Sequence, residues 1–186
     1  MQFICSIYPQ QKACLSHLRK IIQEKSVVKG ELLLRPGQVN RELYFIRRGL
    51  IRSYFLQGKN EVVDFFLWER EAIVEVGSFY EQSPSRGFLQ MMEDGDLYFI
   101  TYEDLQYLYR TYIEFNYVGR VLQERYYMMF FKLCRSLKAE TALERYRGVL
   151  ENQPELLHRV PLGDLAKYLK MRPETLSRVR NRLQRI

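Results

Sequence analysis

Between positions 27 and 101 the chain is a succession of short β-rich runs separated by turn residues. Aromatic and branched residues fill VVKGELLL, ELYFIRRGLIRSYFL, EVVDFFLW, EAIVEV, GFLQMM and DLYFIT. Gly, Pro, Asn or Asp interrupts them about every ten positions, as in all-β domains. Parallel strands need crossover connections of a dozen or more residues, and these intervals leave no room for them. The spacing therefore predicts an antiparallel sandwich or barrel and argues against a parallel α/β sheet.

Helical periodicity flanks the β-region on both sides. The stretch 9–24 has apolar residues at helical spacing. After the β-region, Thr101 and Asp104 resemble a capping box that opens a helix. A long helix is then predicted from about residue 112 to about 137, because apolar residues recur there at steps of three and four.

The apolar stripe of this long helix consists of Phe115, Val118, Leu122, Tyr126, Met129, Leu133 and Leu137. The stripe is too long to cover one small β-domain. Burying it against the same helix of a second copy gives a parallel coiled-coil dimer, and the further apolar residues Tyr127, Phe130 and Phe131 favour this solution. The alternative is that the stripe packs on its own sandwich.

The end of the chain reads as three more helices. The first is predicted at about 139–151, and two short ones follow at 163–169 and 173–183. Pro173 suits a first helical position, where its missing N–H is not needed. Two short helices joined by a tight turn are typical of a helix-turn-helix.

Basic charge is concentrated on these last helices. Residues 159–186 hold eight Lys and Arg against two Asp and Glu, which is +6 of the formal net charge of +7, whereas residues 1–118 have a net charge of −1. Such a footprint indicates a polyanionic partner, either nucleic acid or an anionic membrane. A solvated basic tail is the simpler alternative, but the regularly spaced leucines argue against it.

The polar face of the last predicted helix carries side chains that can read base edges in a DNA major groove. Arg178 can pair bidentately with guanine, and Glu174 can accept from a cytosine amino group. The predicted base-reading residues are Glu174, Thr175, Ser177, Arg178 and Asn181. The predicted phosphate contacts are Lys167, Arg172, Arg180 and Arg182. The glutamate favours base reading, since an acid weakens a purely electrostatic contact with a polyanion.

The order of the predicted elements and the C-terminal sequence resemble those of a known family. An N-terminal helix, short strands, a long helix and a C-terminal helix-turn-helix are similar in order to the CRP/FNR superfamily of bacterial transcription regulators. The run LGDLAKYLKMRPETLSRVRNRL carries the resemblance most strongly, and ERYRGVLENQP resembles the preceding helix, particularly in a Bacteroidetes-like branch. Two positions depart from the family pattern: Pro173 stands where a reading Arg is common, and Lys170 stands where the turn commonly has glycine.

The resemblance implies an α+β fold in three parts. Residues 1–111 would form an antiparallel jelly-roll sensor domain, like that of cyclic-nucleotide-binding proteins, with flanking helices. Residues 112–138 would form a dimerisation helix and hinge, and residues 139–186 a helix-turn-helix DNA-binding domain.

The same resemblance places an effector pocket in the stretch EVGSFYEQSPSRGFLQMMED. Its residues would be Gly77, Ser78, Phe79, Ser85, Arg86 and Gly87. Gly77-Ser78 stands where the family has a Gly-Glu pair, so the acid that holds the ribose is missing. The family's Arg-Ser order is reversed, and a shift of one residue along a strand turns a side chain to the opposite face. Cyclic AMP is therefore not expected to bind in the usual way. The effector is unknown, and no cofactor is assigned.

Other chemistries lack the residues that they need. The cysteines Cys5, Cys14 and Cys134 form no disulfide framework and are too few for a four-cysteine cluster. His17 and His158, the only histidines, lie outside the strands and cannot supply haem or cupin ligands. No catalytic triad or phosphate-binding glycine loop is present, so the chain is not expected to be an enzyme.

The sequence thus predicts a homodimeric regulator that binds a palindromic site in double-stranded DNA, with half-sites about 34 Å apart. A contact with RNA polymerase is a further expected partner interaction, although no residue can be named for it. No run of about 18 apolar residues and no signal-peptide pattern is present, so we expect a cytoplasmic protein without a membrane partner. The rival hypothesis is a protein- or RNA-interaction module that uses the basic C-terminal helices, with the sandwich as scaffold.

Overall fold

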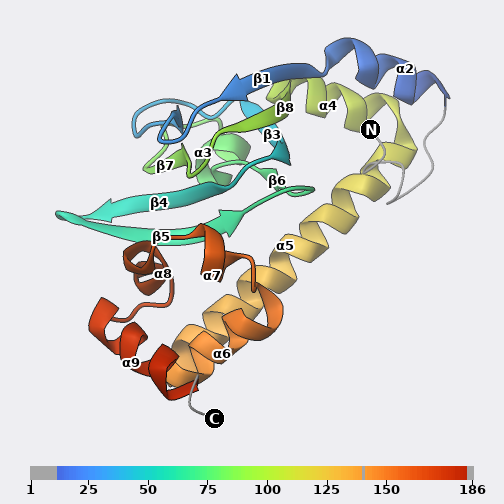
Figure 1. Cartoon of the computed structure of the whole chain (residues 1–186). Helices are drawn as coiled ribbons and strands as arrows, with labels where there is room; N and C mark the ends of the chain where they lie inside the picture. The colour runs from blue at the N-terminus through green and yellow to red at the C-terminus, as the bar shows by residue number, and fades with distance from the viewer. Residues whose placement is uncertain (1–11, 140, 184–186) are drawn as a thin grey trace.

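Two four-stranded antiparallel sheets face each other at the centre of the molecule (Figure 1). The computed structural model describes residues 12–139 and 141–183. The first sheet has the order β1 (Gln23–Val27), β8 (Gly95–Thr101), β3 (Glu42–Arg48) and β6 (Ala72–Ile73). The second has the order β2 (Leu32–Leu34), β7 (Gly87–Met91), β4 (Ile51–Gln57) and β5 (Asn60–Leu67). The predicted antiparallel sandwich of an α+β, jelly-roll-like fold is confirmed.

The space between the sheets is filled by the branched residues of the β-rich runs. Ile51, Leu89 and Leu97 are fully or almost fully buried there, together with Met91. Each such side chain contributes about 1.5–3 kcal/mol by leaving water. Gly49, in the turn between β3 and β4, has φ +113°, and a Cβ at this position would lie 3.2 Å from the Gly95 Cα. The turn therefore requires glycine both for its backbone conformation and for its close contact with β8.

Four helices flank the sandwich. They are α2 (Lys12–Ile21), α3 (Val76–Glu81), α4 (Tyr102–Thr111) and α5 (Ile113–Ala139). Thr101 caps α4, since its Oγ1 accepts a hydrogen bond from the Asp104 N–H at 3.0 Å. The predicted N-terminal helix extended too far, because residues from Gln23 onward pair with β8 instead. Its first residues, 9–11, and Cys5 lie outside the described residues.

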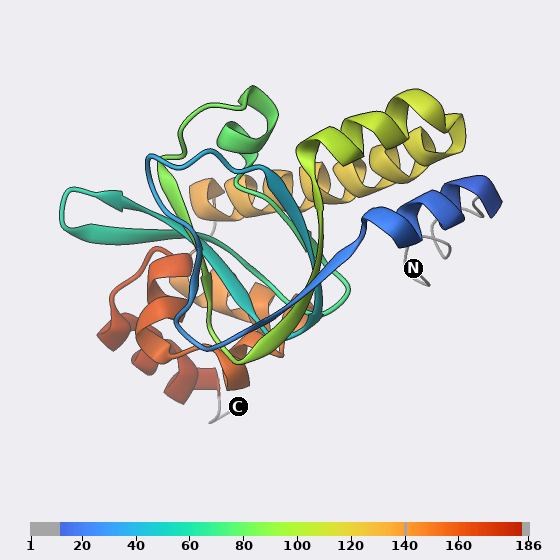
Figure 2. The same ribbon diagram turned by 90° about the horizontal axis from the view of Figure 1, so that it is seen from above.

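The apolar stripe of α5 packs on its own chain. Phe115 and Val118 are 3% and 1% exposed in a cluster with α2 and α4, and Figure 2 shows α4 alongside the first half of α5. The Tyr126 hydroxyl donates a hydrogen bond to the Ala72 carbonyl at 2.5 Å, and Leu133 packs against the C-terminal helices. Phe115 and Val118 are therefore buried within one chain and are not available to a dimer seam. The assignment of the half-buried stripe residues to such a seam stays a prediction. Leu122 and Met129 likewise pack against clusters of the same chain.

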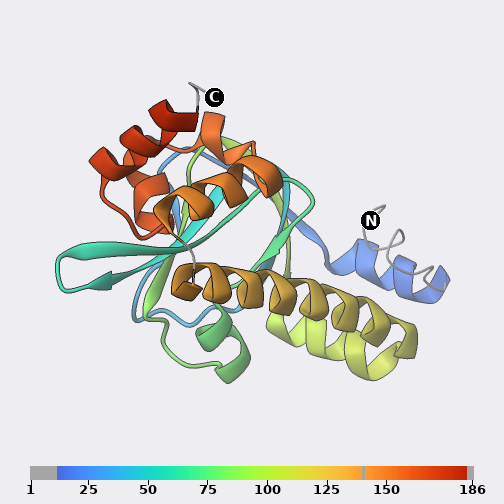
Figure 3. The ribbon, with the colours of Figure 1, turned by 90° about the horizontal axis from the view of Figure 1, so that it is seen from below.

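The C-terminal helices gather under the second sheet (Figure 3). They are α6 (Ala142–Asn152), α7 (Leu156–Arg159), α8 (Leu162–Tyr168) and α9 (Pro173–Leu183). Thr141 and Glu144 form a capping box at the start of α6, so this helix begins later than predicted. Helix α9 has the predicted bounds and starts at the proline.

One hydrophobic cluster joins these helices to the sheet. Val63 and Phe66 of β5 share it with Tyr146 of α6 and with Leu165 and Tyr168 of α8. The rings of Phe66 and Tyr168 meet edge to face with centroids 5.5 Å apart. The division into three parts at residues 111 and 138 remains a prediction, and this core crosses it. Within the described ranges, no helix is long and apolar enough to cross a membrane.

Candidate nucleic-acid interface and effector cavity

The turn between α8 and α9 is held in one conformation by hydrogen bonds to its backbone. Lys170 has φ +48°, which is the left-handed region. The Met171 N–H donates to the Ala166 carbonyl at 3.0 Å, and the Arg145 Nε donates to the Leu169 carbonyl at 2.9 Å. The position where the family commonly has glycine thus keeps the left-handed conformation. A lysine accepts it at a cost of about 1–2 kcal/mol.

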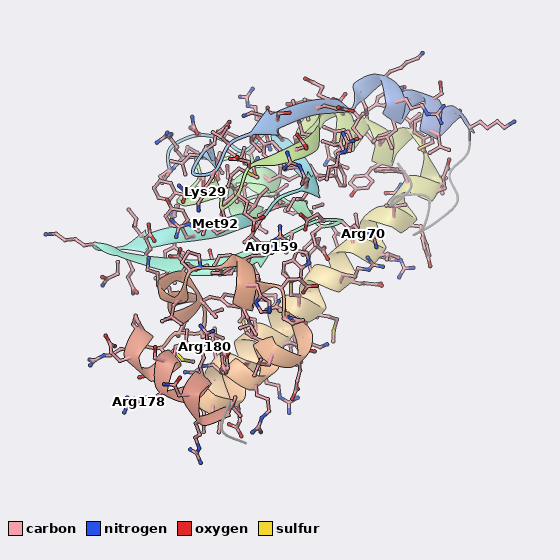
Figure 4. All side chains as sticks on the ribbon, viewed as in Figure 1. Lys29, Arg70, Met92, Arg159, Arg178 and Arg180 are labelled. Carbon is pink, nitrogen blue, oxygen red and sulfur yellow. The ribbon has the colours of Figure 1, made fainter. Side chains whose placement is uncertain are left out.

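Helix α9 presents a polar face because its apolar side is buried. Leu176 is 0% exposed, and Val179 and Leu183 pack against the same cluster. Among the predicted base-reading residues, the exposed ones are Glu174, Arg178 and Asn181, and the half-buried ones are Thr175 and Ser177. Arg178 extends away from the body of the molecule (Figure 4). All five lie on one short helix whose polar side is open to solvent in this chain.

The predicted phosphate contacts divide into two groups. Arg172 and Arg182 are exposed and Arg180 is half-buried. Lys167 is instead engaged by the sandwich: its Nζ lies 2.7 Å from the Glu61 carboxylate of β5 and 3.2 Å from Asp164. The hydrogen bond with Glu61 is the main reason why the pKa of Lys167 is raised. In this arrangement Lys167 is not free to neutralise a phosphate.

Arg52, on β4, is the centre of this contact. Its side chain is 10% exposed, and its Nη1 lies 3.0 Å from the Glu61 carboxylate and 3.1 Å from Asp164 of α8. Its Nη2 also donates to the Gln90 side chain at 2.7 Å. The guanidinium stacks over Tyr54, 4.3 Å from the ring centroid. A buried arginine satisfied on all sides in this way fixes α8 to the sheet.

A second ion cluster joins α7 to the sandwich. Arg159, the last residue of α7, lies 2.8 Å from the Glu69 carboxylate and 2.6 Å from that of Glu93, and it is labelled in Figure 4. Glu69 also accepts from the Gly49 N–H at 2.8 Å. The hydrogen bond with Arg159 is the largest cause that lowers the pKa of Glu69 to about 2. Sequence spacing gave no signal for either cluster, because the ion pairs that join the helices to the sandwich link residues 66 to 112 positions apart.

A cavity of about 520 Å³ lies between the sandwich and α5. The strands β4, β5 and β6 form one wall, α3 and α4 a second, and the middle of α5 a third. Its apolar and aromatic lining includes Leu67, Ile73, Phe79, Leu105, Leu122 and Met129. Of the six predicted effector residues, only Phe79 lines it.

The other predicted effector residues hold the backbone of the α3 region together. Ser78 is 2% exposed, and its Oγ accepts from the Asn40 N–H at 2.8 Å and donates to the Ser83 carbonyl. Ser85 is 4% exposed and bonds through its Oγ to the backbone of Gly87. Gly77 lies in α3 and does not line the cavity either.

A phosphate cradle is not assembled among the described residues. The Glu75 carboxylate already accepts the Ser78 N–H at the start of α3, at 2.8 Å, and a second anion there would be repelled. Arg86 is exposed and does not line the cavity. Gly77, Ser78, Ser85, Arg86 and Gly87 thus lie outside this cavity, and their part in an effector pocket stays a prediction.

A β-bulge shapes the wall of the cavity. Ser53 pairs with Phe65 and the next residue, Tyr54, pairs with Val63, so Asp64 is an extra residue in β5. In a regular strand Asp64 and Phe65 would face opposite ways, whereas both line the cavity here. Burial is the main cause that raises the pKa of Asp64 to about 6. A bulge re-aims side chains in this manner and is frequent beside functional sites.

Comparisons with known proteins agree with this architecture. Residues 24–112 match the model of the cyclic nucleotide-binding domain family. Electron transport regulator A of Shewanella oneidensis is 25% identical over an alignment of 185 positions that covers 92% of this chain and 73% of that protein.

Solved structures extend the likeness to nearly the whole chain. The c-di-GMP responsive global regulator CLP of Xanthomonas campestris superposes with a TM-score of 0.71 at 21% identity, covering 94% of this chain and 92% of that one. A transcriptional regulator of the CRP/FNR family from Eubacterium rectale gives a TM-score of 0.73 at 14% identity, covering 96% and 88%. The expected resemblance is confirmed: this chain has the fold of CRP/FNR transcription regulators.

Proposed function

We propose that this chain, with its CRP/FNR regulator fold, is a homodimeric, cytoplasmic transcription regulator that reads a palindromic DNA site with α9. One observation carries the proposal. Helix α9 buries Leu176 completely and leaves Glu174, Arg178 and Asn181 exposed on its outer face. Arginine, glutamate and asparagine are the side chains that pair with guanine, cytosine and adenine in a major groove.

The charge on α9 fits such a partner. Arg172 and Arg182 are exposed near the two ends of the helix, where phosphates of either strand would lie beside a helix in the major groove. Phosphate contacts of this kind supply affinity, while the exposed Arg178 and Glu174 supply discrimination between bases.

A second copy of the chain would supply a second α9 helix for the other half of the DNA site. The later half of α5 exposes Tyr127, Phe130 and Phe131 by 69%, 53% and 49%. Exposed aromatic residues grouped on one helix are typical of interfaces, and a two-fold dimer through them would present two α9 helices to successive major grooves. The proposed seam thus uses these residues and not the buried stripe.

The contact between α8 and the sandwich supports regulation of DNA binding by a change in the position of α8 and α9. Lys167, which would otherwise face phosphate, is held by Glu61 in this arrangement. A state in which α8 leaves the sheet would free Lys167 and change the position of α9. An effector that binds the two states with different affinities would shift their populations.

Selection of bound sequences from a random duplex DNA pool, at physiological salt, tests the function. We expect a palindrome with half-sites about one helical turn apart. Recovery of no motif, with binding that declines steadily as salt rises, would contradict the proposal and favour an interaction module whose basic helices bind RNA or an acidic protein.

A further inference from the structure

The cavity between the sandwich and α5 has the volume of a ligand site. Its volume of about 520 Å³ lies within the range of about 300–1,000 Å³ typical of small-molecule pockets. Three different parts of the fold line it: the strands β4 to β6, the helices α3 and α4, and the middle of α5. A ligand here would contact the sandwich and the long helix at the same time.

The lining is rich in aromatic rings. Phe65, Tyr80, Tyr109, Tyr127 and Phe130 come from β5, α3, α4 and α5 and all border the cavity. The face of an aromatic ring carries partial negative charge and attracts a cation, and aromatic cages are the usual binding sites of quaternary ammonium groups.

The formal charge in the lining has one sign. Asp64 and Glu75 contribute carboxylates, and no lysine, arginine or histidine of the described chain borders the cavity. One Glu75 oxygen accepts the Ser78 N–H. The Asp64 carboxylate has no hydrogen-bond partner among residues 12–139 and 141–183. The two carboxylates would repel an anionic ligand. A cationic ligand would instead supply the positively charged partner that the Asp64 carboxylate lacks.

We propose that this cavity binds a small organic cation, namely an apolar molecule that carries a quaternary or protonated amine nitrogen. The nitrogen lies against Asp64 and the aromatic rings, and the apolar body fills the space beside Leu67, Ile73 and Leu122. The proposal names the effector class for the proposed regulator and rests on that function for its regulatory consequence. Binding of the ligand itself does not require DNA.

The electrostatics of the cavity agree with this assignment. Burial raises the pKa of Asp64 to about 6, the charge of Glu75 adds to the rise, and the charge of Lys170 opposes it. A bound cation would favour the ionised carboxylate and relieve its burial.

The cavity walls are in contact with the C-terminal helices, so a bound ligand could change the position of those helices. Asp64 and Phe65 line the cavity, and the next residue, Phe66, packs on Tyr168 of α8. On the other wall, Tyr126 donates to the Ala72 carbonyl and joins α5 to β6. A molecule between β5 and α5 therefore touches both elements that position the C-terminal helices.

The test measures binding of matched probes to the full chain at pH 7.5, without DNA, by isothermal titration calorimetry. The cationic probe is benzyltrimethylammonium, its uncharged carbon isostere is neopentylbenzene, and the anionic probes are phenylacetate and cyclic AMP. We expect the cation to bind at least about ten-fold more tightly than the isostere and the anions to give no heat of binding. Equal affinity for the cation and the isostere, or no binding of the cation, would overturn the proposal.

Substitutions locate the probe. Asp64→Asn keeps the shape of the side chain and should remove most of the preference for the cation over the isostere. Tyr80→Leu removes a half-exposed ring of the cavity wall and should lower the affinity for the cation more than the affinity for the isostere. Glu151→Gln removes one negative charge from an exposed site on α6 and is the control. It should change the affinity for neither probe. A preference that survives Asp64→Asn unchanged would refute the role of the carboxylate.

The regulatory part is measured separately. DNA affinity with and without benzyltrimethylammonium is compared on a selected site. Cation binding without a change in DNA affinity would sustain the ligand site and contradict its role as effector. Failure of the DNA selection itself would contradict the proposed function and leave the calorimetric result standing.

Discussion

The Arg52 guanidinium on β4 lies 3.1 Å from the Asp164 carboxylate on α8, although 112 residues separate them in sequence. Arg52 is almost fully buried and also contacts Glu61 and Gln90. Together with the cluster around Arg159, this contact makes the positions of α7 and α8 depend on charges that belong to the sandwich.

Replacing Arg52 by methionine should therefore loosen the C-terminal helices. The change leaves Glu61 and Asp164 without a buried cation, and breaking such a pair costs about 3–5 kcal/mol when fully buried. Because Glu61 and Asp164 are partly exposed and Lys167 remains beside them, we expect a loss of about 2 kcal/mol in the free energy of unfolding. Chemical denaturation measures it, and limited proteolysis should show earlier cleavage after α5. Arg48→Met, on β3 of the other sheet at an exposed pair with Asp96, is the control and should change little.

Glu69 should make the protein less stable in acid. Its pKa in the folded state is about 2, below the ordinary value of 4.5, because Arg159 holds the carboxylate. The unfolded state thus binds the proton more readily, so the stabilisation is complete above about pH 4.5 and is lost as pH falls toward 2. Glu69 is about one third exposed, so solvent screening reduces the contribution to about 1 kcal/mol. Glu69→Gln should remove this part of the pH dependence in denaturation curves between pH 3 and 6, and an unchanged slope would contradict the assignment.

Asp64 should act in the opposite direction. Its pKa in the folded state is about 6, above the ordinary value of 3.8. The folded state binds the proton more readily, so stability falls as pH rises from about 4 to about 6 and stays lower above that range. Since the group is partly exposed, we expect Asp64→Asn to raise the free energy of unfolding at pH 7.5 by about 1–2 kcal/mol. At pH 4 the substitution should have almost no effect, which separates this cause from a change in packing.

Lys170 offers a test of the turn. Its φ of +48° is costly for a residue with a Cβ and free for glycine. We expect Lys170→Gly to stabilise the protein by about 0.5–1 kcal/mol, since the greater freedom of glycine in the unfolded chain offsets part of the gain. Lys170→Ala removes the charge but keeps the Cβ, and it should bring no such gain. Equal effects of the two substitutions on the melting temperature would show that charge, and not conformation, decides.

Arg178 separates base reading from plain attraction to DNA. Arg178→Ala should cost about 1–3 kcal/mol on the selected site and relax the preference for one base pair. Arg120 is exposed in the first half of α5 and paired with Glu124, outside the polar face of α9, and Arg120→Ala should leave both affinity and preference unchanged. A uniform small loss on every sequence after Arg178→Ala would mean that the arginine contacts phosphate only.

The sequence predicted those parts of the fold that local patterns determine. Helix α9 begins at Pro173 and ends at Leu183 because proline, the spacing of Leu176 and Val179, and the polar face all agree within eleven residues. The strands follow from alternating β-rich runs and turn residues in the same way. The short helix α7 was missed, since four residues are too few to establish a helical period.

The candidate site was less predictable because it depends on contacts over long distances. Val63 and Phe66 face the C-terminal helices while Phe65 and Leu67 face the other sheet. No single alternating pattern produces that arrangement, and only the bulge at Asp64 explains it. The pairing of Lys167 with Glu61 is equally invisible in sequence, because either residue alone resembles a solvated surface charge.

The hydrophobic cluster shared by the sheet and the reader has a thermodynamic consequence. Segments as short as 141–183 bury too little surface to be very stable alone, and this one shares part of its interior with Val63 and Phe66. In the docked arrangement the two halves should melt as a single cooperative unit. If α9 binds DNA as proposed, an undocked C-terminal segment must recover that lost burial from another surface. Part of the free energy of DNA binding would then be spent on keeping this segment folded. A C-terminal segment that is neither packed on the sheet nor bound to DNA would then be the form most open to proteolysis. Proteases would therefore remove this form first and leave the molecules in which the segment is packed on the sheet or bound to DNA.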